Sequence, residues 1–260
     1  MDLERIATVL NAETLLQLSQ REIGLIHVKS FYVCPVIQEV AGKAIDHPKL
    51  GHYHKKYTSS VGRICVPHID TEDDAEAADA YYREAESNIS EIRSLFFPYL
   101  SPVDYVRLRL QELWPAGANI QRLHGRGCFV GAIRVFEPEL SHFLPHNDRI
   151  DFESDAPEVK DITEQLVANI YLEVPDSGGD LQLWLREPSS DEHHVIRDVE
   201  GIASSEVTPP AITIHPDAGD LTIFSSRMLH AVTPCKDRYR VGMAAFIGCR
   251  GISQPLTYWS

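Results

Sequence analysis

The chain has 260 residues, 43% of them hydrophobic and 24% charged, which is the profile of an ordinary soluble globular protein. Its formal net charge of -14 argues against a nucleic-acid partner, because a polyanionic backbone would repel it. Five scattered cysteines without a CxxC spacing, no signal-peptide pattern in "MDLERIATVL" and no apolar run near the roughly 18 residues that span a bilayer predict a cytoplasmic protein with no membrane partner.

The first half of the chain has mainly helical patterns. "LNAETLLQLSQRE" predicts a helix behind an Asn11 cap, and "PVIQEVAGKAI" predicts a second helix. "GLIHVKSFYV", between them, reads as a short strand. Residues 71–97 form a long helical pattern with acids in the first turn, and "SPVDYVRLRLQELW" predicts a helix capped by Ser101 with Pro102 at its first position.

The pattern changes after Pro115. Short runs rich in Val, Ile, Phe and Tyr alternate with turn residues, in "GAIRVFEP", "EQLVANIYLEV", "GGDLQLWL", "PAITIHPDAGDLTIFS", "HAVTP" and "YRVGMAAFIG". This pattern predicts a β core of sandwich or barrel type. No linker or repeat interrupts the chain, so we expect a single domain over 1–260, with 1–114 as a mainly helical flank and 115–250 as the β core.

A possible metal site lies in "SHFLPHNDRID". His146 and Asp148 stand two residues apart, so on an extended chain their side chains point to the same side. One imidazole and one carboxylate are two-thirds of a facial metal site. A second histidine, His230, begins a predicted strand after "GDLTIF", and Arg240 follows ten residues later, on the same side of its strand as Gly242.

These four residues, His146, Asp148, His230 and Arg240, resemble the motif of the non-haem iron(II), 2-oxoglutarate-dependent oxygenases over roughly residues 115–250. Within this family, the overall sequence pattern is most similar to that of small bacterial amino-acid hydroxylases and related alkaloid halogenases. The resemblance implies a double-stranded β-helix, or jelly roll, flanked by helices. It also implies that His146, Asp148 and His230 bind iron(II), and that Arg240 binds the far carboxylate of 2-oxoglutarate.

The activity implied is hydroxylation of an unactivated C–H bond of a small molecule, and the expected substrate is an amino acid or a derivative. O2 would be the second cosubstrate, and succinate and CO2 would be the coproducts. Desaturation or cyclisation of a natural-product intermediate is an alternative outcome. A halogenase of the same family is disfavoured, because such enzymes replace the carboxylate ligand with a small residue and Asp148 is present. A non-catalytic jelly-roll binding protein is the second alternative. Substrate identity and oligomeric state stay open.

Other candidates compete for these roles. "VPHID" contains a second His-x-Asp pair, His68 and Asp70, but it leads into the acidic helix and not into the β core. Arg238 is the alternative anchor for the cosubstrate, with Arg134 next. Asn169 and Tyr171 are expected to face the pocket and contact the cosubstrate. Side chains alternate along a strand, and the aliphatic Ile170 and Leu172 suit the side that packs away from the pocket.

The remaining polar segments are interpreted more simply. His193 and His194 in "SSDEHHVIRD" are predicted to lie in a loop. "GHYHKKYTSSVGR", with His52 and His54, is predicted to be a loop that could cover the pocket. Trp184 is expected in the core.

Overall fold

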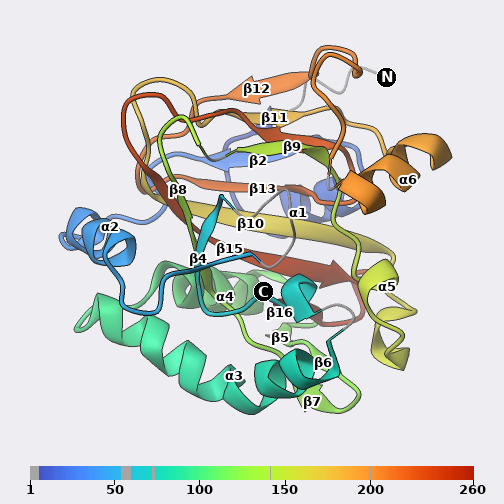
Figure 1. The fold of residues 1–260 in the computed structure, drawn as a ribbon. Helices are drawn as coiled ribbons and strands as arrows, with labels where there is room; N and C mark the ends of the chain where they lie inside the picture. Colours follow the sequence, from blue (N-terminus) through green and yellow to red (C-terminus); the bar gives the residue numbers. More distant parts are fainter. Residues whose placement is uncertain (1–5, 54–59, 72–73, 141, 200) are drawn as a thin grey trace.

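The computed structural model describes residues 6–53, 60–71, 74–140, 142–199 and 201–260. Two β-sheets face each other, and helices lie outside the larger one (Figure 1). The larger sheet has the order β1 (Ile6–Ala7), β2 (Leu25–Val28), β13 (Leu221–Ser225), β10 (Glu164–Glu173), β15 (Arg240–Cys249), β8 (Ala132–Phe136), β4 (Gly62–Ile64), β3 (Gly51–His52), and β16 (Leu256–Trp259) joins β15 to β5 (Ala118–Ile120).

The smaller sheet supplies the opposite wall. Its order is β12 (Ile212–Ile214), β11 (Leu181–Leu183), β14 (His230–Val232) and β9 (Phe143–His146), and all its pairings are antiparallel. A separate two-stranded ribbon is formed by β6 (Arg122–Leu123) and β7 (Arg126–Gly127). The sequence-based expectation of a sheet-rich fold with flanking helices is therefore confirmed.

The helices of the first half follow their predicted signals. These are α1 (Ala12–Ser19), α2 (Ile37–Ile45), α3 (Ala75–Phe96) and α4 (Pro102–Leu113). Asn11 caps α1 in a reciprocal capping box with Thr14, and the Ser101 hydroxyl accepts a hydrogen bond from the backbone of Asp104. Helices α1, α2 and α4 contact strands of the larger sheet, so they cover the side that faces away from the smaller sheet.

Strand β10 shows how the two sides of the larger sheet are used. Ile170 and Leu172 are fully buried in the main hydrophobic core, beneath the helices. Asn169 and Tyr171 point to the other side and line a pocket between the sheets. Because side chains alternate along a strand, one strand contributes both to the core and to the pocket.

One local prediction was wrong, and a second was wrong at the two ends of its segment. The segment that contains His193 and His194 is a helix, α6 (Ser190–Val199), because Ser189 and Glu192 cap its start reciprocally. Both ends of "GHYHKKYTSSVGR" belong to strands, since β3 and β4 add to the edge of the larger sheet next to β8. The middle of that segment, including His54, lies outside the described residues.

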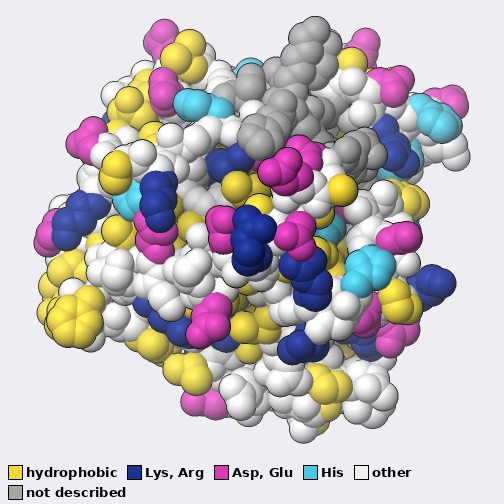
Figure 2. All heavy atoms as spheres, turned by 60° about the horizontal axis from the view of Figure 1, so that its bottom comes forward, with side chains coloured by type: hydrophobic (Ala, Val, Ile, Leu, Met, Phe, Trp, Pro, Cys, Tyr) yellow, Lys and Arg dark blue, Asp and Glu magenta, His cyan; other side chains and the backbone are white. Residues whose placement is uncertain are grey.

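The short elements α5 (Ile150–Glu153), η1 (His68–Thr71) and η2 (Pro157–Val159) complete the fold. Within the described ranges, no helix is both long enough and apolar enough to cross a membrane. On the face drawn in Figure 2, basic and acidic side chains are interspersed.

Candidate metal centre

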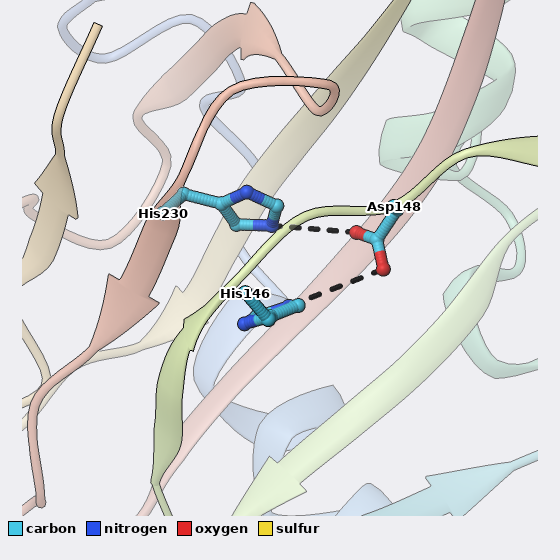
Figure 3. A group of neighbouring side chains, drawn as sticks. All are labelled: His146, Asp148 and His230. Carbon is cyan, nitrogen blue, oxygen red and sulfur yellow. Dashed lines mark ion pairs between the residues drawn. The ribbon is translucent and has the colours of Figure 1, made fainter. Parts of the chain in front are cut away.

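Three side chains with metal-binding groups meet between the sheets. β9 ends at His146, β14 begins at His230, and the two residues are paired across the strands. Asp148 follows two residues after His146, and its backbone N–H donates to the carbonyl of Ser226. One possible ligand atom from each of the three residues lies within 4.8 Å of the others, and Figure 3 shows the carboxylate facing both imidazoles. No other such cluster of three occurs in the part of the chain that the structure describes.

The imidazoles are oriented by backbone carbonyls. His146 Nδ1 lies 2.6 Å from the Leu144 oxygen, and His230 Nδ1 lies 3.0 Å from the Met228 oxygen. A carbonyl can only accept, so each Nδ1 carries the hydrogen and each Nε2 keeps a free electron pair. The two Nε2 atoms lie 4.0 Å and 3.3 Å from the Asp148 oxygens, which places both electron pairs beside the carboxylate.

The protonation states suit a divalent cation. Burial, together with the neighbouring His230, lowers the pKa of His146 to about 4. Burial opposes ionisation of Asp148, but the two facing imidazoles and the cation of Arg134 hold the pKa of this carboxyl below its usual range. At neutral pH His146 is therefore neutral and Asp148 is anionic, which are the forms that bind metals. The donor set fits iron(II) with an open opposite side.

A pocket of about 510 Å³, a volume that includes its open mouth, adjoins the three residues. Both sheets contribute to its wall, so it lies between them. The larger sheet contributes Arg134, Phe136, Val167, Asn169, Tyr171, Phe224, Arg240, Gly242, Met243 and Ala244, and the remainder are Phe143, His146, Asp148, Leu181, His230 and Val232. Phe143 and Phe224 were not singled out from the sequence, because an aromatic residue in a strand gives no signal that separates a pocket wall from a core.

Arg240 is a buried cation at one end of this pocket. Its guanidinium carbon lies 4.8 Å from the ring centre of Phe136 and 5.1 Å from that of Tyr171. Its Nε is buried and has no hydrogen-bond partner among the described residues. A buried donor without a partner is costly, so this guanidinium is suited to an anionic ligand.

The two residues predicted beside Arg240 also line the pocket. The Tyr171 hydroxyl lies 2.8 Å from the Thr222 hydroxyl, and burial raises the pKa of Tyr171 despite the nearby charge of Arg240. Asn169 is partly buried on the same side of β10. Arg238 lies elsewhere, since it is half-exposed and pairs with Asp176 and Asp237.

Arg134 is the second cation of the pocket. From the sequence its place was undecided, because a lone arginine in an apolar strand suits either a pocket or a sheet edge. In β8 it stands opposite Gly242 of β15, on the pocket side. Its Nε donates to the Tyr53 hydroxyl at 3.0 Å, and its guanidinium lies 5.7 Å from the Phe143 ring centre.

The other His-x-Asp pair is placed differently. Asp70 is buried and accepts from Arg63 Nε at 2.8 Å, so its charge is already matched. His68 packs edge-on against Tyr81 and Tyr82. Neither residue lines the pocket.

His193, His194 and His52 also stay outside the pocket lining, and His54 lies outside the described residues. His193 lies against Phe152, and His194 and His52 are exposed. Trp184 belongs to a small hydrophobic cluster with Ile196 and is a core residue, as expected.

Comparisons with known proteins agree with the class of protein that the sequence predicted, an enzyme of the iron(II)- and 2-oxoglutarate-dependent oxygenases. The family model described as "Carrier-protein-independent halogenase WelO5" matches residues 1–260, so the chain belongs to this family.

Two curated relatives and a solved structure are similar to the chain. An L-gamma-glutamyl-L-propargylglycine hydroxylase of Streptantibioticus cattleyicolor is 23% identical over 249 residues, which is 92% of this chain and 88% of that protein. An L-isoleucine 3(1)-dioxygenase of Pantoea ananatis is 24% identical over 148 residues, 53% of this chain and 48% of that protein. The fold resembles an N-substituted L-amino acid dioxygenase of Burkholderia ambifaria, with a TM-score of 0.61, 17% identity, and coverage of 96% of this chain and 91% of that one.

Proposed function

We propose that this enzyme hydroxylates an unactivated C–H bond of an amino acid or an amino-acid derivative, using iron(II), 2-oxoglutarate and O2. The observation that carries the proposal is the complete His146–Asp148–His230 set in one pocket with the buried, incompletely paired Arg240. The two curated relatives support the substrate class, since their names give a hydroxylase and a dioxygenase of amino-acid compounds.

The proposed fold is a jelly roll that spans 1–260 as one domain. Two facing sheets with the pocket between them, and the match of the family model to the full chain, support this reading. The helices of 1–114 would then be the flank of this domain and not a separate unit.

Each residue has a separate task in this proposal. His146, Asp148 and His230 hold iron(II) through two neutral nitrogens and one oxyanion. Arg240 binds the far carboxylate of 2-oxoglutarate through its planar fork of donors. Tyr171 and Asn169 contact the cosubstrate from the neighbouring strand, and the Thr222 hydroxyl holds the Tyr171 hydroxyl in place.

The bound iron and cosubstrates supply the oxidising power, and 2-oxoglutarate leaves as succinate and CO2. The chain positions the target C–H bond and limits the access of water. The aromatic side chains of the wall contribute to that exclusion. Phe143 and Phe224 pack against the two histidines, and the guanidinium groups of the two arginines lie over Phe143 and Phe136.

Halogenation is the alternative that the family description raises. Asp148 argues against it, because the carboxylate occupies the coordination position that a halide would need. A jelly-roll protein without catalysis is the other alternative, and the complete donor set argues against that one.

Two measurements test the proposal. Anaerobic addition of iron(II) and 2-oxoglutarate should give the weak visible absorption of the chelate, and an amino-acid screen in air should find compounds that stimulate succinate release. The product should gain oxygen and, with excess chloride present, no chlorine. Absence of the chelate band, or chlorination by the unaltered enzyme, would contradict the proposed function.

A further inference from the structure

The charged groups of the pocket do not balance unless the substrate brings a negative charge. Among the described residues that line the pocket, the charged side chains are Asp148, Arg134 and Arg240. With a divalent metal and doubly charged 2-oxoglutarate bound as proposed, Asp148 and Arg240 bring the total to zero. The positive charge of Arg134 then remains without a counter-ion in a partly buried site, which is unfavourable.

Arg134 is presented toward the pocket by three aligned strands. It lies between Arg63 of β4 and Gly242 of β15 in register. Gly242 has no side chain, and a Cβ atom there would come within 3.2 Å of the Ile170 carbonyl. This close backbone approach favours glycine at the position opposite Arg134, and both residues line the pocket.

The neighbours of Arg134 orient it without neutralising it. Its Nε donates to the Tyr53 hydroxyl. The guanidinium carbon of Arg63 lies over the Tyr53 ring, 5.9 Å from the ring centre. Arg63 is neutralised by Asp70 in a buried pair at 2.6 Å. A tyrosine hydroxyl carries no charge, so this hydrogen bond orients one edge of the Arg134 guanidinium. Among the described residues, no further hydrogen bond or ion pair engages its two terminal nitrogens, which can therefore bind a ligand.

Arg134 is close to the metal centre. Its guanidinium lies over the Phe143 ring, and the Phe143 ring centre is 5.3 Å from that of His146. Arg240 instead lies over Phe136 and Tyr171. The two guanidinium groups therefore stack on different rings, although the register of β8 and β15 makes the two residues diagonal neighbours.

From this geometry we infer that Arg134 binds a carboxylate of the substrate, and so selects anionic amino-acid compounds over their neutral analogues. The inference rests on the proposed function and narrows its substrate class. Tyr53 is a positioning residue, because it acts on the substrate only through Arg134.

The first arm of the test separates substrate from cosubstrate. The anaerobic chelate band gives the Kd of 2-oxoglutarate for the unaltered enzyme, Arg134→Gln and Arg240→Gln. Arg240→Gln should weaken this affinity at least about tenfold, as expected for a lost hydrogen bond to a charged group, while Arg134→Gln stays within about twofold. A loss in Arg134→Gln as large as that in Arg240→Gln would overturn the inference, because Arg134 would then hold the cosubstrate.

The second arm uses a panel of aliphatic L-amino acids and their N-acyl and γ-glutamyl derivatives, each beside a counterpart with every carboxylate converted to an amide. Succinate release measures turnover, and anaerobic calorimetry measures binding. We expect only the carboxylates to be active, and Arg134→Gln to raise their Kd and KM at least about tenfold. Arg134→Lys should recover part of this loss and Tyr53→Phe should lose only severalfold. The exposed Arg238→Gln is the control and should match the unaltered enzyme.

The outcomes are distinct. If the unaltered enzyme forms no chelate, the proposed function itself fails. Two results would show that the assignment of Arg134 is wrong while the proposed function can stand. In the first, the chelate forms but the enzyme turns over amides as well as acids. In the second, the chelate forms but no compound of the panel is active. An equal loss for acids and amides in Arg134→Gln would also overturn it, since that pattern reports a structural role.

Discussion

The chain contains the pattern His-x-Asp twice, and the two copies lie in very different surroundings. Asp70 is buried against Arg63, which neutralises it, and His68 packs on tyrosine rings. Asp148 instead faces two imidazoles whose Nε2 atoms are free to bind. The His-x-Asp spacing alone therefore does not make a metal site. A carboxylate that already has a cation partner has little to offer a metal, whereas one opposite neutral imidazoles does.

The largest expected effect is on the pair that we assign to iron. Asp148→Ala should abolish hydroxylation, because iron loses its only anionic protein ligand. His146→Ala and His230→Ala should each weaken iron(II) binding by more than about 100-fold. Loss of a residue that only hydrogen-bonds to a metal ligand already weakens metal affinity by up to about 100-fold, and loss of the ligand itself should cost more. Metal titration measures this, with His68→Ala as the matched control that keeps its affinity. Loss of iron binding in His68→Ala, with His146→Ala unaffected, would exchange the roles of the two pairs.

Changes to the other pair, His68 and Asp70, should affect the stability of the protein and not its iron binding. Asp70→Asn leaves the Arg63 guanidinium buried and uncompensated, so the free energy of unfolding should fall by about 3–5 kcal/mol. Iron affinity of the folded protein should not change. Urea unfolding and metal titration of the same preparation check both statements. An Asp70→Asn variant of normal stability that fails to bind iron would contradict the structural role.

Arg240 and Arg238 differ in the same way, because the buried Nε of Arg240 has no partner among the described residues whereas Arg238 forms ion pairs. Arg240→Ala should weaken 2-oxoglutarate binding by at least about tenfold and plausibly several hundredfold, since charge-assisted hydrogen bonds contribute roughly 1.5–3 kcal/mol and an unpaired buried charge costs more. Iron affinity without cosubstrate should barely move, and Arg240→Lys should recover only part of the loss. Arg238→Ala, whose guanidinium already pairs with Asp176, should do little. A large effect of Arg238→Ala in succinate-release kinetics would refute this assignment.

The smallest predicted effect is a pH dependence of the metal-free protein. His146 has a folded-state pKa of about 4, below the ordinary value of 6.5, so the folded state binds fewer protons than the unfolded state between these values. Stability should therefore decrease as pH falls, by about 1–2 kcal/mol between pH 7 and pH 5. His146→Gln should remove this slope. Urea unfolding across the range measures it, and an unchanged slope in the variant would mean that other groups cause it.

Much of the fold was readable from the sequence because its signals are local. Asn11 and Ser101 cap the helices that they were predicted to cap, and the strands after Pro115 follow their apolar runs. Strand alternation predicted that His146 and Asp148 would point to the same side, and the resemblance to the oxygenases implied that His230 would join them, as it does in the structure. Helix α6 was missed although Ser189 and Glu192 form a capping box, which is also a local signal.

What the sequence could not give depends on contacts between distant segments. The strand β4 forms because β8 offers it a free edge, and nothing in residues 62–64 alone indicates this pairing. The same holds for Arg134, whose position in the pocket follows from its register with Gly242, more than 100 residues away. The carboxylate of Asp70 looks free in the sequence, and only the fold brings Arg63 to it.

The two ends of the pocket belong to different sheets. The paired histidines come from β9 and β14 of the smaller sheet, and Arg240 comes from the middle of the larger one. A cosubstrate held by iron at one end and by Arg240 at the other would link the two sheets across the pocket. Decarboxylation would break this link, because the carboxylate lost as CO2 is the one that would be held at the metal. The link between the two sheets would therefore exist only while intact 2-oxoglutarate is bound.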